Sequence, residues 1–182
     1  MDMKNPKLIV VDCQKGITDE RLYNFYVFKK NVKCLITECR KLGIEVIYIQ
    51  HDDGPGTEFS IGDDEFQIFE EFAPLENEKC FVKKVFSMFS NQELKKYLEE
   101  SDTLIICGLQ TNYCIDASIK SAFDLGYHII IPKESNSTFD NDYMSSKKTY
   151  AYYNELMWPN NFGECMSVEE VLNMLKYSYG NN

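Results

Sequence analysis

Short, unbroken apolar runs alternate with amphipathic stretches along this sequence, and no other feature restricts its fold as strongly. Five runs read as strands, over residues 7–12, 45–49, 80–82, 103–107 and 128–131. Strands that are apolar throughout are buried on both faces, which is typical of parallel sheets covered by helices. The pattern therefore predicts an α/β fold: a three-layer α-β-α sandwich around a mainly parallel, Rossmann-like sheet of five or six strands.

Helices are expected between these strands, because apolar residues recur there at helical spacing. The predicted helices cover residues 28–42, 90–98, 111–125, 143–157 and 167–175. The second and the last have capping boxes, in which a Ser and a Glu three residues later satisfy backbone N–H groups: Ser90 with Glu93, and Ser167 with Glu170. Thr111 is the expected N-cap of the third helix. The buried face of that helix is predicted at Ile115, Ile119, Ala122 and Phe123.

The charge balance restricts the partners of the chain. Nineteen Lys and Arg against 29 Asp and Glu give a net charge of −10. This sign opposes a phosphate-tracking surface, so neither nucleic acid nor an anionic membrane is an expected partner. No apolar run approaches the roughly 18 residues that span a bilayer, and the polar residues 1–7 do not resemble a signal peptide. We expect a cytoplasmic protein with one domain over residues 1–182.

Seven scattered cysteines give no sign of a disulfide framework or a zinc site. Their number is odd and no C-x-x-C pair occurs, whereas disulfide frameworks use even numbers and zinc sites use clustered ligands. Most are therefore expected to be buried thiols that behave as small hydrophobic residues. No cofactor is predicted.

Three chemically distinct side chains follow predicted strands: Asp12 after the first, Lys83 after the third and Cys114 shortly after the fourth. In parallel α/β sheets, ligands bind beyond the carboxyl ends of the strands, near the point where strand order reverses. Cys114 would lie in a first helical turn, where unsatisfied N–H groups and a nearby ammonium favour the thiolate. Taken singly, each residue also fits a structural role. Their joint placement favours a nucleophilic site.

A nucleotide-binding module is the common alternative for a parallel α/β sheet. The residues after the first strand contain neither G-x-G-x-x-G nor G-x-x-x-x-G-K-[ST], the backbone arrangements that hold phosphates in such modules. This class is therefore not expected.

Four stretches of the chain resemble a known family. They are LIVVDCQ (8–14), IQHDDGPGTEF (49–59), VKKVFSMF (82–89) and ICGLQTNYCIDAS (106–118). Together they resemble the isochorismatase-like cysteine hydrolases, which include nicotinamidases and N-carbamoylsarcosine amidohydrolase. The G-x-x-T-x-x-C element after an apolar strand, with the earlier D-x-Q and K-x-x-x-S-x-F, is a specific combination, and the resemblance extends over nearly the whole chain.

The resemblance implies a catalytic trio of Asp12, Lys83 and Cys114. Lys83 is preferred to Lys84 because the family's lysine stands four residues before the Ser of S-x-F, which is Ser87 here. The implied reaction cleaves a C–N amide-type bond of a small molecule through a thioester on the cysteine, without a cofactor. Isochorismate-cleaving members attack a vinyl ether and need no cysteine at this position, so Cys114 favours the amide-type reaction.

The resemblance also implies the surroundings of the trio. A cis peptide is expected between Leu109 and Gln110, with the backbone N–H groups of Gln110 and Cys114 forming an oxyanion hole. The substrate pocket is expected to involve Gln14, His51, Phe89 and Tyr113.

Two departures from the family pattern stand out. Metal-dependent nicotinamidases have an Asp and two closely spaced His, whereas this chain has only His51 and His128. Neither a metal site nor nicotinamidase activity is therefore expected, and the exposed polar stretch 51–53 is interpreted as solvated. Lys133 and Glu134 stand where relatives often have an Asp after the fifth strand, and no role is predicted for them.

Three functional interpretations remain open from the sequence. The first is the amide-type hydrolase, the second a non-catalytic or scaffold homologue of the same fold, and the third a vinyl ether hydrolase of the isochorismate type. The expected partners are a small-molecule substrate and further copies of the chain, as a dimer or tetramer. The loops 52–72 and 136–143 are expected to determine which substrate fits.

Overall fold

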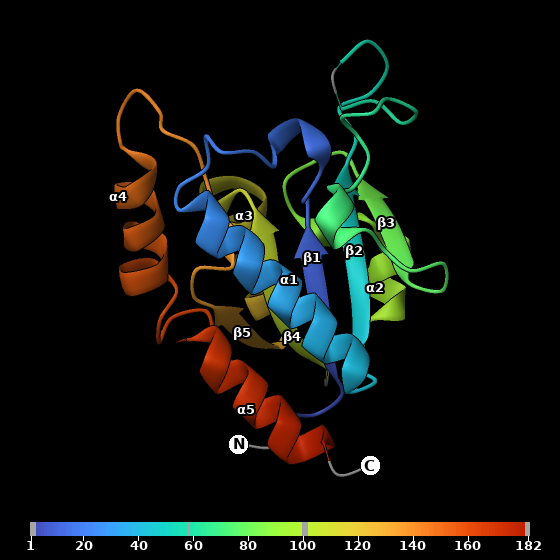
Figure 1. The fold of residues 1–182 in the computed structure, drawn as a ribbon, viewed down its shortest axis with the longest axis vertical. Helices are drawn as coiled ribbons and strands as arrows, with labels where there is room; N and C mark the ends of the chain where they lie inside the picture. Colours follow the sequence, from blue (N-terminus) through green and yellow to red (C-terminus); the bar gives the residue numbers. More distant parts are fainter. Residues whose placement is uncertain (1–2, 58, 100–101, 181–182) are drawn as a thin grey trace.

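A parallel sheet forms the centre of the computed structural model, which describes residues 3–57, 59–99 and 102–180 (Figure 1). The strand order is β3-β2-β1-β4-β5-β7, with β6 paired to β4, and every pairing between strands is parallel. The strands are β1 Pro6–Val11, β2 Glu45–His51, β3 Lys79–Lys83, β4 Thr103–Leu109, β5 His128–Pro132, β6 Asn136–Ser137 and β7 Glu164–Met166. The predicted fold class is confirmed. The ends of the predicted domain and Glu58 of the matched stretch 49–59 lie outside the described residues.

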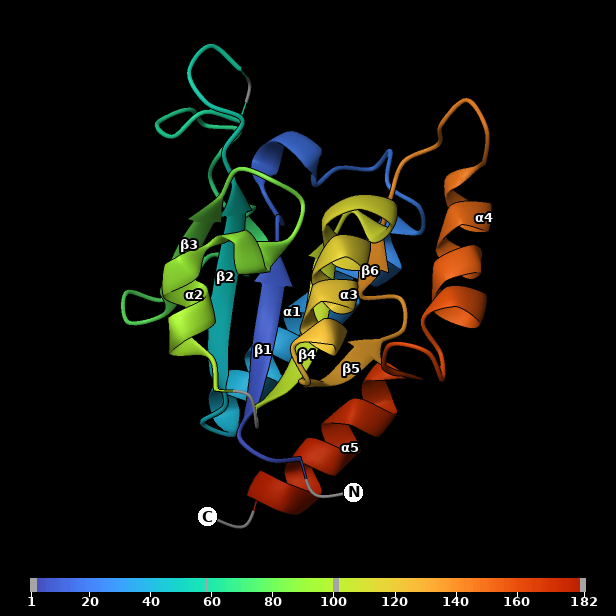
Figure 2. The same cartoon turned by 180° about the vertical axis from the view of Figure 1, so that it is seen from behind.

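Helices cover both faces of the sheet and complete the three layers. They are α1 Phe25–Lys41, α2 Gln92–Tyr97, α3 Asp116–Asp124, α4 Ser146–Ala151 and α5 Val168–Tyr179. Helices α1 and α5 lie on one face (Figure 1), α2 and α3 on the other, and α4 stands to one side (Figure 2). Alternate residues of β1 enter two separate cores: Leu8 and Val10 pack with α1, and Ile9 and Val11 pack on the side of α2 and α3. All of β1 is buried, as its unbroken apolar run predicted.

The sheet has seven strands, so it exceeds the expected five or six. All five predicted strands are present, and the additional ones are β6 with two residues and β7 with three. Neither produces an apolar run long enough to recognise, and β6 consists of the polar residues Asn136 and Ser137. These short strands form because the chain runs beside β4 and β5 at those points, which local sequence does not determine.

The predicted cap of α2 and the predicted burial of Phe123 were wrong. Helix α2 is capped by Asn91, whose side chain accepts from the Leu94 N–H at 2.9 Å, because Ser90 instead ends the preceding 3₁₀ turn and donates to the Ser87 carbonyl. Phe123 is 49% exposed and packs edge-on against the ring of Phe162. The capping box predicted at the start of α5 is confirmed.

Two further expectations concern the cysteines and the membrane. Cys13, Cys39, Cys107 and Cys114 are buried, Cys80 is exposed, and all seven thiols are free. Among the described residues, no helix combines the length and the apolar character needed to cross a bilayer.

Candidate active site

The polar residues singled out above meet where strand order reverses. The chain passes from β1 to β2 on one side, and β4 pairs with β1 on the other. Asp12 directly follows β1, Lys83 is the last residue of β3, and Cys114 lies in the turn after β4. This is the position at which ligands bind in open α/β sheets.

The ends of β1 and β4 approach each other very closely at Gly108. Its φ is +122°, and an added Cβ would stand 2.0 Å from the carbonyl oxygen of Val11. Only glycine fits such an approach. Asp12 follows Val11 with a left-handed φ of +49°, a conformation that Asp tolerates better than most residues. The backbone thus brings the acid and the turn that carries the thiol to one point.

Cys114 lies in a π-helical turn, Thr111–Ile115, that precedes α3. The prediction that Thr111 caps the helix was wrong, because its hydroxyl instead donates to Asn136 Oδ1 at 2.7 Å and so ties the turn to β6. The peptide bond between Leu109 and Gln110 is cis, at the expected position. The carbonyl of Gln110 accepts hydrogen bonds from the N–H groups of Tyr113 and Ile115, which holds the turn around the cysteine.

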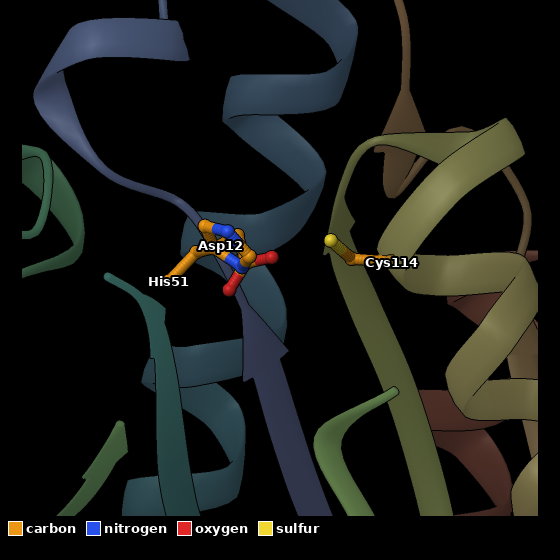
Figure 3. Close-up of side chains that lie close together, drawn as sticks. All are labelled: Asp12, His51 and Cys114. Carbon is orange, nitrogen blue, oxygen red and sulfur yellow. The ribbon is translucent and has the colours of Figure 1, made fainter. Parts of the chain in front are cut away.

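The ammonium of Lys83 lies at the centre of the site. Its Nζ is 2.7 Å from Asp12 Oδ2, 3.2 Å from Cys114 Sγ and 2.9 Å from His51 Nδ1. Figure 3 shows Asp12 and His51 facing the Cys114 sulfur from neighbouring segments. The three contacts match the three protons of an ammonium group. Lys84, by contrast, is 72% exposed and pairs with Asp52 at 3.5 Å.

His51 continues this chain of contacts toward the surface. Its Nε2 lies 2.8 Å from Asp53 Oδ1. Because the Lys83 ammonium can only donate, Nδ1 must accept, so a neutral ring carries its proton on Nε2 and donates it to Asp53. Gln14 fixes the backbone of His51 from both sides: its Oε1 accepts from the His51 N–H at 2.7 Å, and its Nε2 donates to the His51 carbonyl at 3.0 Å.

Burial changes the protonation of the acid and the thiol. It raises the pKa of Asp12 above its ordinary value, against the opposing effect of Lys83. Burial, with the Asp12 charge as second cause, raises the pKa of Cys114 to about 12. The expectation of a preformed thiolate is therefore wrong, because desolvation has a larger effect on this pKa than Lys83 has. The resting site contains a thiol, and Asp12 Oδ1, which is buried and accepts no hydrogen bond from the described residues, can take its proton.

The donor set around Lys83 does not favour a divalent metal. Ligand atoms of Asp12, His51 and Cys114 lie within 4.8 Å of one another, a spacing that alone would suit an ion. The Lys83 ammonium, however, donates to all three of these residues and provides the positive charge there. Asp52 accepts from the Gly54 N–H and the Lys84 ammonium. The Lys83 ammonium thus occupies the place that a bound cation would take.

A cavity of about 260 Å³ opens above the trio. This is slightly below the range of about 300–1,000 Å³ typical of pockets for drug-sized ligands, so the cavity suits a small molecule. Ten residues line it: Asp12, Gln14, Ile17, His51, Asp53, Phe59, Phe86, Gln110, Tyr113 and Cys114. It thus includes every residue expected there except Phe89 and Lys83; the Lys83 ammonium reaches the site through its contacts with Asp12 and Cys114.

Phe89 belongs to the core and is absent from the residues lining this cavity. It is 7% exposed and stacks on Tyr127 with ring centroids 5.3 Å apart. Phe86, three residues earlier, contributes the ring at the cavity mouth and lies 5.7 Å from that of Tyr113. Sequence reasoning also missed Phe59 and Asp53 as lining residues. Both come from the long loop after β2, and no local pattern shows which of its side chains turn inward.

Glu134, one of the two residues without a predicted role, connects α1 to the segment around α4. Its carboxylate accepts from Asn24, its carbonyl accepts from Asn31, and its N–H donates to the Tyr150 hydroxyl. These contacts are structural and lie away from the cavity-lining residues.

The buried pair of Lys83 and Asp12 leads to a prediction about stability. Their side chains are 0% and 2% exposed, and removing one member of a buried pair leaves the other charge uncompensated, typically at about 3–5 kcal/mol. Lys83→Met is expected to lower the free energy of unfolding by that amount at pH 8. Urea denaturation of Asp12→Asn/Lys83→Met should give a value near that of the wild type.

The pH dependence of this effect has a definite sign. Burial already raises the folded-state pKa of Asp12, and the loss of Lys83 raises it further. A carboxyl group whose pKa is higher in the folded than in the unfolded state stabilises the fold at pH values below its unfolded-state pKa. This stabilisation is lost as the pH rises through its folded-state pKa. The loss in free energy of unfolding caused by Lys83→Met should therefore be smaller at pH 5 than at pH 8. An equal loss at both pH values, or a double variant as unstable as the single one, would contradict the role of this pair.

Comparison with known proteins places this geometry in a family. The isochorismatase domain model matches residues 6–170. The chain is 30% identical over 137 residues to the uncharacterized isochorismatase family protein YrdC of Bacillus subtilis (strain 168), an alignment covering 72% of this chain and 73% of the relative. It is 23% identical over 137 residues to the streptothricin hydrolase of Streptomyces noursei, covering 73% of this chain and 50% of that protein.

Solved structures agree in fold. A cysteine hydrolase from Pseudomonas syringae pv. phaseolicola 1448A superimposes with a TM-score of 0.86 at 22% identity, over 96% of this chain and 94% of that one. An isochorismatase from Pseudomonas putida KT2440 gives a TM-score of 0.83 at 20% identity, over 93% of each chain. Since the family's domain model extends over most of its length, the chain belongs to the isochorismatase family.

Proposed function

We propose that this protein is a cysteine hydrolase that cleaves a C–N amide-type bond of a small molecule through a thioester intermediate. The observation that carries the proposal is the Lys83 ammonium, which donates to both Asp12 Oδ2 and Cys114 Sγ at the base of the cavity. A thiol beside a group that can take its proton is what nucleophilic catalysis by cysteine requires, and Lys83 holds Asp12 and Cys114 in this arrangement.

The first half of the reaction forms the thioester. Asp12 Oδ1 takes the proton of the Cys114 thiol as the sulfur attacks the carbonyl carbon of the substrate. The backbone N–H groups of Gln110 and Cys114 hold the resulting oxyanion. Asp12 then returns the proton to the nitrogen of the leaving group, the C–N bond breaks, and ammonia or an amine departs. Lys83 keeps the carboxylate and the sulfur in contact while negative charge moves between them.

The second half releases the product. Water attacks the thioester carbon while Asp12 accepts one of its protons. The C–S bond then breaks, the sulfur regains a proton from Asp12, and the carboxylic acid product leaves. Protons balance over the cycle, and the enzyme returns to the thiol and carboxylate with which it began.

Two features favour this reaction over the alternatives. The thiol pKa of about 12 makes an adjacent base necessary, and Asp12 is placed to act as one. Vinyl ether cleavage of the isochorismate type does not require the thiol. The name of the Streptomyces noursei relative, streptothricin hydrolase, supports hydrolysis as the class of reaction. A homo-oligomeric state and a cytoplasmic location remain predictions from the sequence.

Trapping the thioester tests the proposal. The wild-type chain is incubated with small primary amides, carbamoyl compounds and isochorismate, ammonia release is measured, and acid-quenched samples are digested for mass spectrometry. The expected result is ammonia release from at least one amide or carbamoyl compound, with the matching acyl mass on the peptide that contains Cys114. Turnover without an adduct, or turnover of isochorismate alone, would contradict the covalent mechanism. Absence of both turnover and adduct would favour the non-catalytic homologue.

A further inference from the structure

The cavity carries an unbalanced negative charge. Two carboxylates, Asp12 and Asp53, are among its lining residues, and none of those lining residues is Lys or Arg. The charge of Asp12 is compensated by Lys83, whose Nζ lies 2.7 Å from Asp12 Oδ2. Among the described residues no Lys or Arg pairs with Asp53, whose side-chain partner is His51 Nε2 at 2.8 Å. A ligand in this cavity therefore experiences the charge of Asp53 without a compensating positive group.

Asp53 lies at the rim of the cavity, where a ligand can reach it. Its side chain is 48% exposed. The nearby lysines have other partners: Lys15 pairs with Asp64 at 2.7 Å and with Glu70 at 3.1 Å, and Lys84 pairs with Asp52. Neither of them neutralises Asp53.

Aromatic rings supply the other walls of the mouth. Phe59, Phe86 and Tyr113 line the cavity together with Asp53. The faces of such rings attract cations, and they lack any donor that could hold a carboxylate, apart from the Tyr hydroxyl. A carboxylate and aromatic rings at the cavity mouth stabilise a bound organic cation and repel an organic anion.

We infer that the substrates are small amides that bear a positively charged ammonium or guanidinium group, which binds at Asp53 and the rings while the amide carbonyl lies against Cys114. This inference rests on the proposed function and adds the charge class of the substrate. Small anionic amides are excluded, because the lining residues provide no Lys or Arg to pair with a carboxylate.

Charge-matched thiol reagents test the inference without requiring turnover. The probes are the 2-aminoethyl, 2-hydroxyethyl and 2-sulfonatoethyl methanethiosulfonates, which are cationic, neutral and anionic. Labelling rates are followed by peptide mapping at Cys114 and at the exposed Cys80. The net charge of −10 attracts the cationic reagent to the whole protein, and the labelling rates at Cys80 serve as the internal reference that corrects for this attraction. Relative to Cys80, Cys114 is expected to prefer the cationic over the anionic reagent by about tenfold, the combined effect of an ion pair and cation–π contacts.

Asp53→Asn isolates the charge, because the Asn oxygen still accepts from His51. This variant should reduce the preference at Cys114 to that at Cys80. Asp124→Asn is the matched control, since it removes one charge from an exposed residue at the end of α3, and it should leave the preference unchanged. A wild-type protein without the preference, or a preference that persists in Asp53→Asn, would overturn the inference.

A second measurement separates this inference from the proposed function. Ammonia release is compared for 4-(aminomethyl)benzamide, 4-ethylbenzamide and 4-carbamoylphenylacetate, which differ mainly in charge. Turnover that is fastest for the cationic amide supports both proposals. Turnover without a charge preference would overturn the inference alone. Labelling selectivity without turnover of any amide in this series or in the earlier screen would support cation recognition and contradict the hydrolase.

Discussion

Cys114→Ala is expected to lower kcat/KM for the amide substrate by about 10⁴-fold or more, because no thioester can form without the sulfur. The remaining rate would come from substrate binding and the backbone N–H groups alone. The fold should survive, since Cys114 is a small side chain at the floor of a cavity and 8% exposed. Ammonia release measured at saturating and limiting substrate gives kcat and KM separately, and kcat should account for most of the loss.

Cys114→Ser is the informative companion variant. It keeps the size of the side chain and an acidic proton near Asp12, but a hydroxyl is a much weaker nucleophile than a thiol at this pH. We expect it to bind substrate and to lose kcat almost as completely as the Ala variant. Thermal denaturation of both variants checks that the fold is intact. Full ammonia release by Cys114→Ala would exclude the thioester mechanism.

Asp12→Asn is expected to lower kcat by about 10³-fold, within the range that general acid–base catalysis contributes. The variant cannot take the thiol proton or return it to the leaving nitrogen. Its effect on the thiol itself should have the opposite sign. The Asp12 charge raises the pKa of Cys114 and the Lys83 charge lowers it, so removing the carboxylate increases the thiolate fraction. Alkylation of Cys114 by iodoacetamide should therefore be faster in Asp12→Asn than in the wild type.

The pH profile of the wild type provides a further check. Asp12 must be ionised to act as a base, and burial raises its pKa above the ordinary 3.8. The acid limb of kcat/KM should therefore lie at a higher pH than an exposed aspartate would give. An acid limb near the ordinary value would contradict Asp12 as the base. So would slower alkylation and slower turnover together in Asp12→Asn, since that combination indicates a disrupted site.

The sequence predicted the sheet and the meeting of the trio for one physical reason. Strands buried on both faces must be apolar, so a polar residue at the end of such a run marks the edge of the sheet. Asp12 follows such a run in β1, Lys83 ends the edge strand β3, and parallel strands bring their carboxyl ends to one side. The loop residues Asp53 and Phe59 have no such signal, because an irregular segment does not determine which side chains face inward.

Other errors came from applying local rules where tertiary contacts decide. Thr111 is a good cap in isolation, but the buried Asn136 offers its hydroxyl a partner. The position of Cys114 near a helix start suggested a thiolate, but burial and Asp12 have the larger effect on its pKa. The cap of α2 was predicted at Ser90, but this residue belongs to the 3₁₀ turn Met88–Ser90, and the adjacent Asn91 caps the helix.

The contact at Gly108 also bears on how new specificities can arise in this scaffold. Any side chain there would collide with the Val11 backbone, so the separation of acid and sulfur is a property of two main chains and leaves no freedom for gradual adjustment. The rim consists of side chains, several of them on loops, and each of these can be exchanged alone. Directed evolution toward other amides should therefore collect its changes at positions such as Phe59 and Phe86, while the glycine stays invariant across every library that retains turnover.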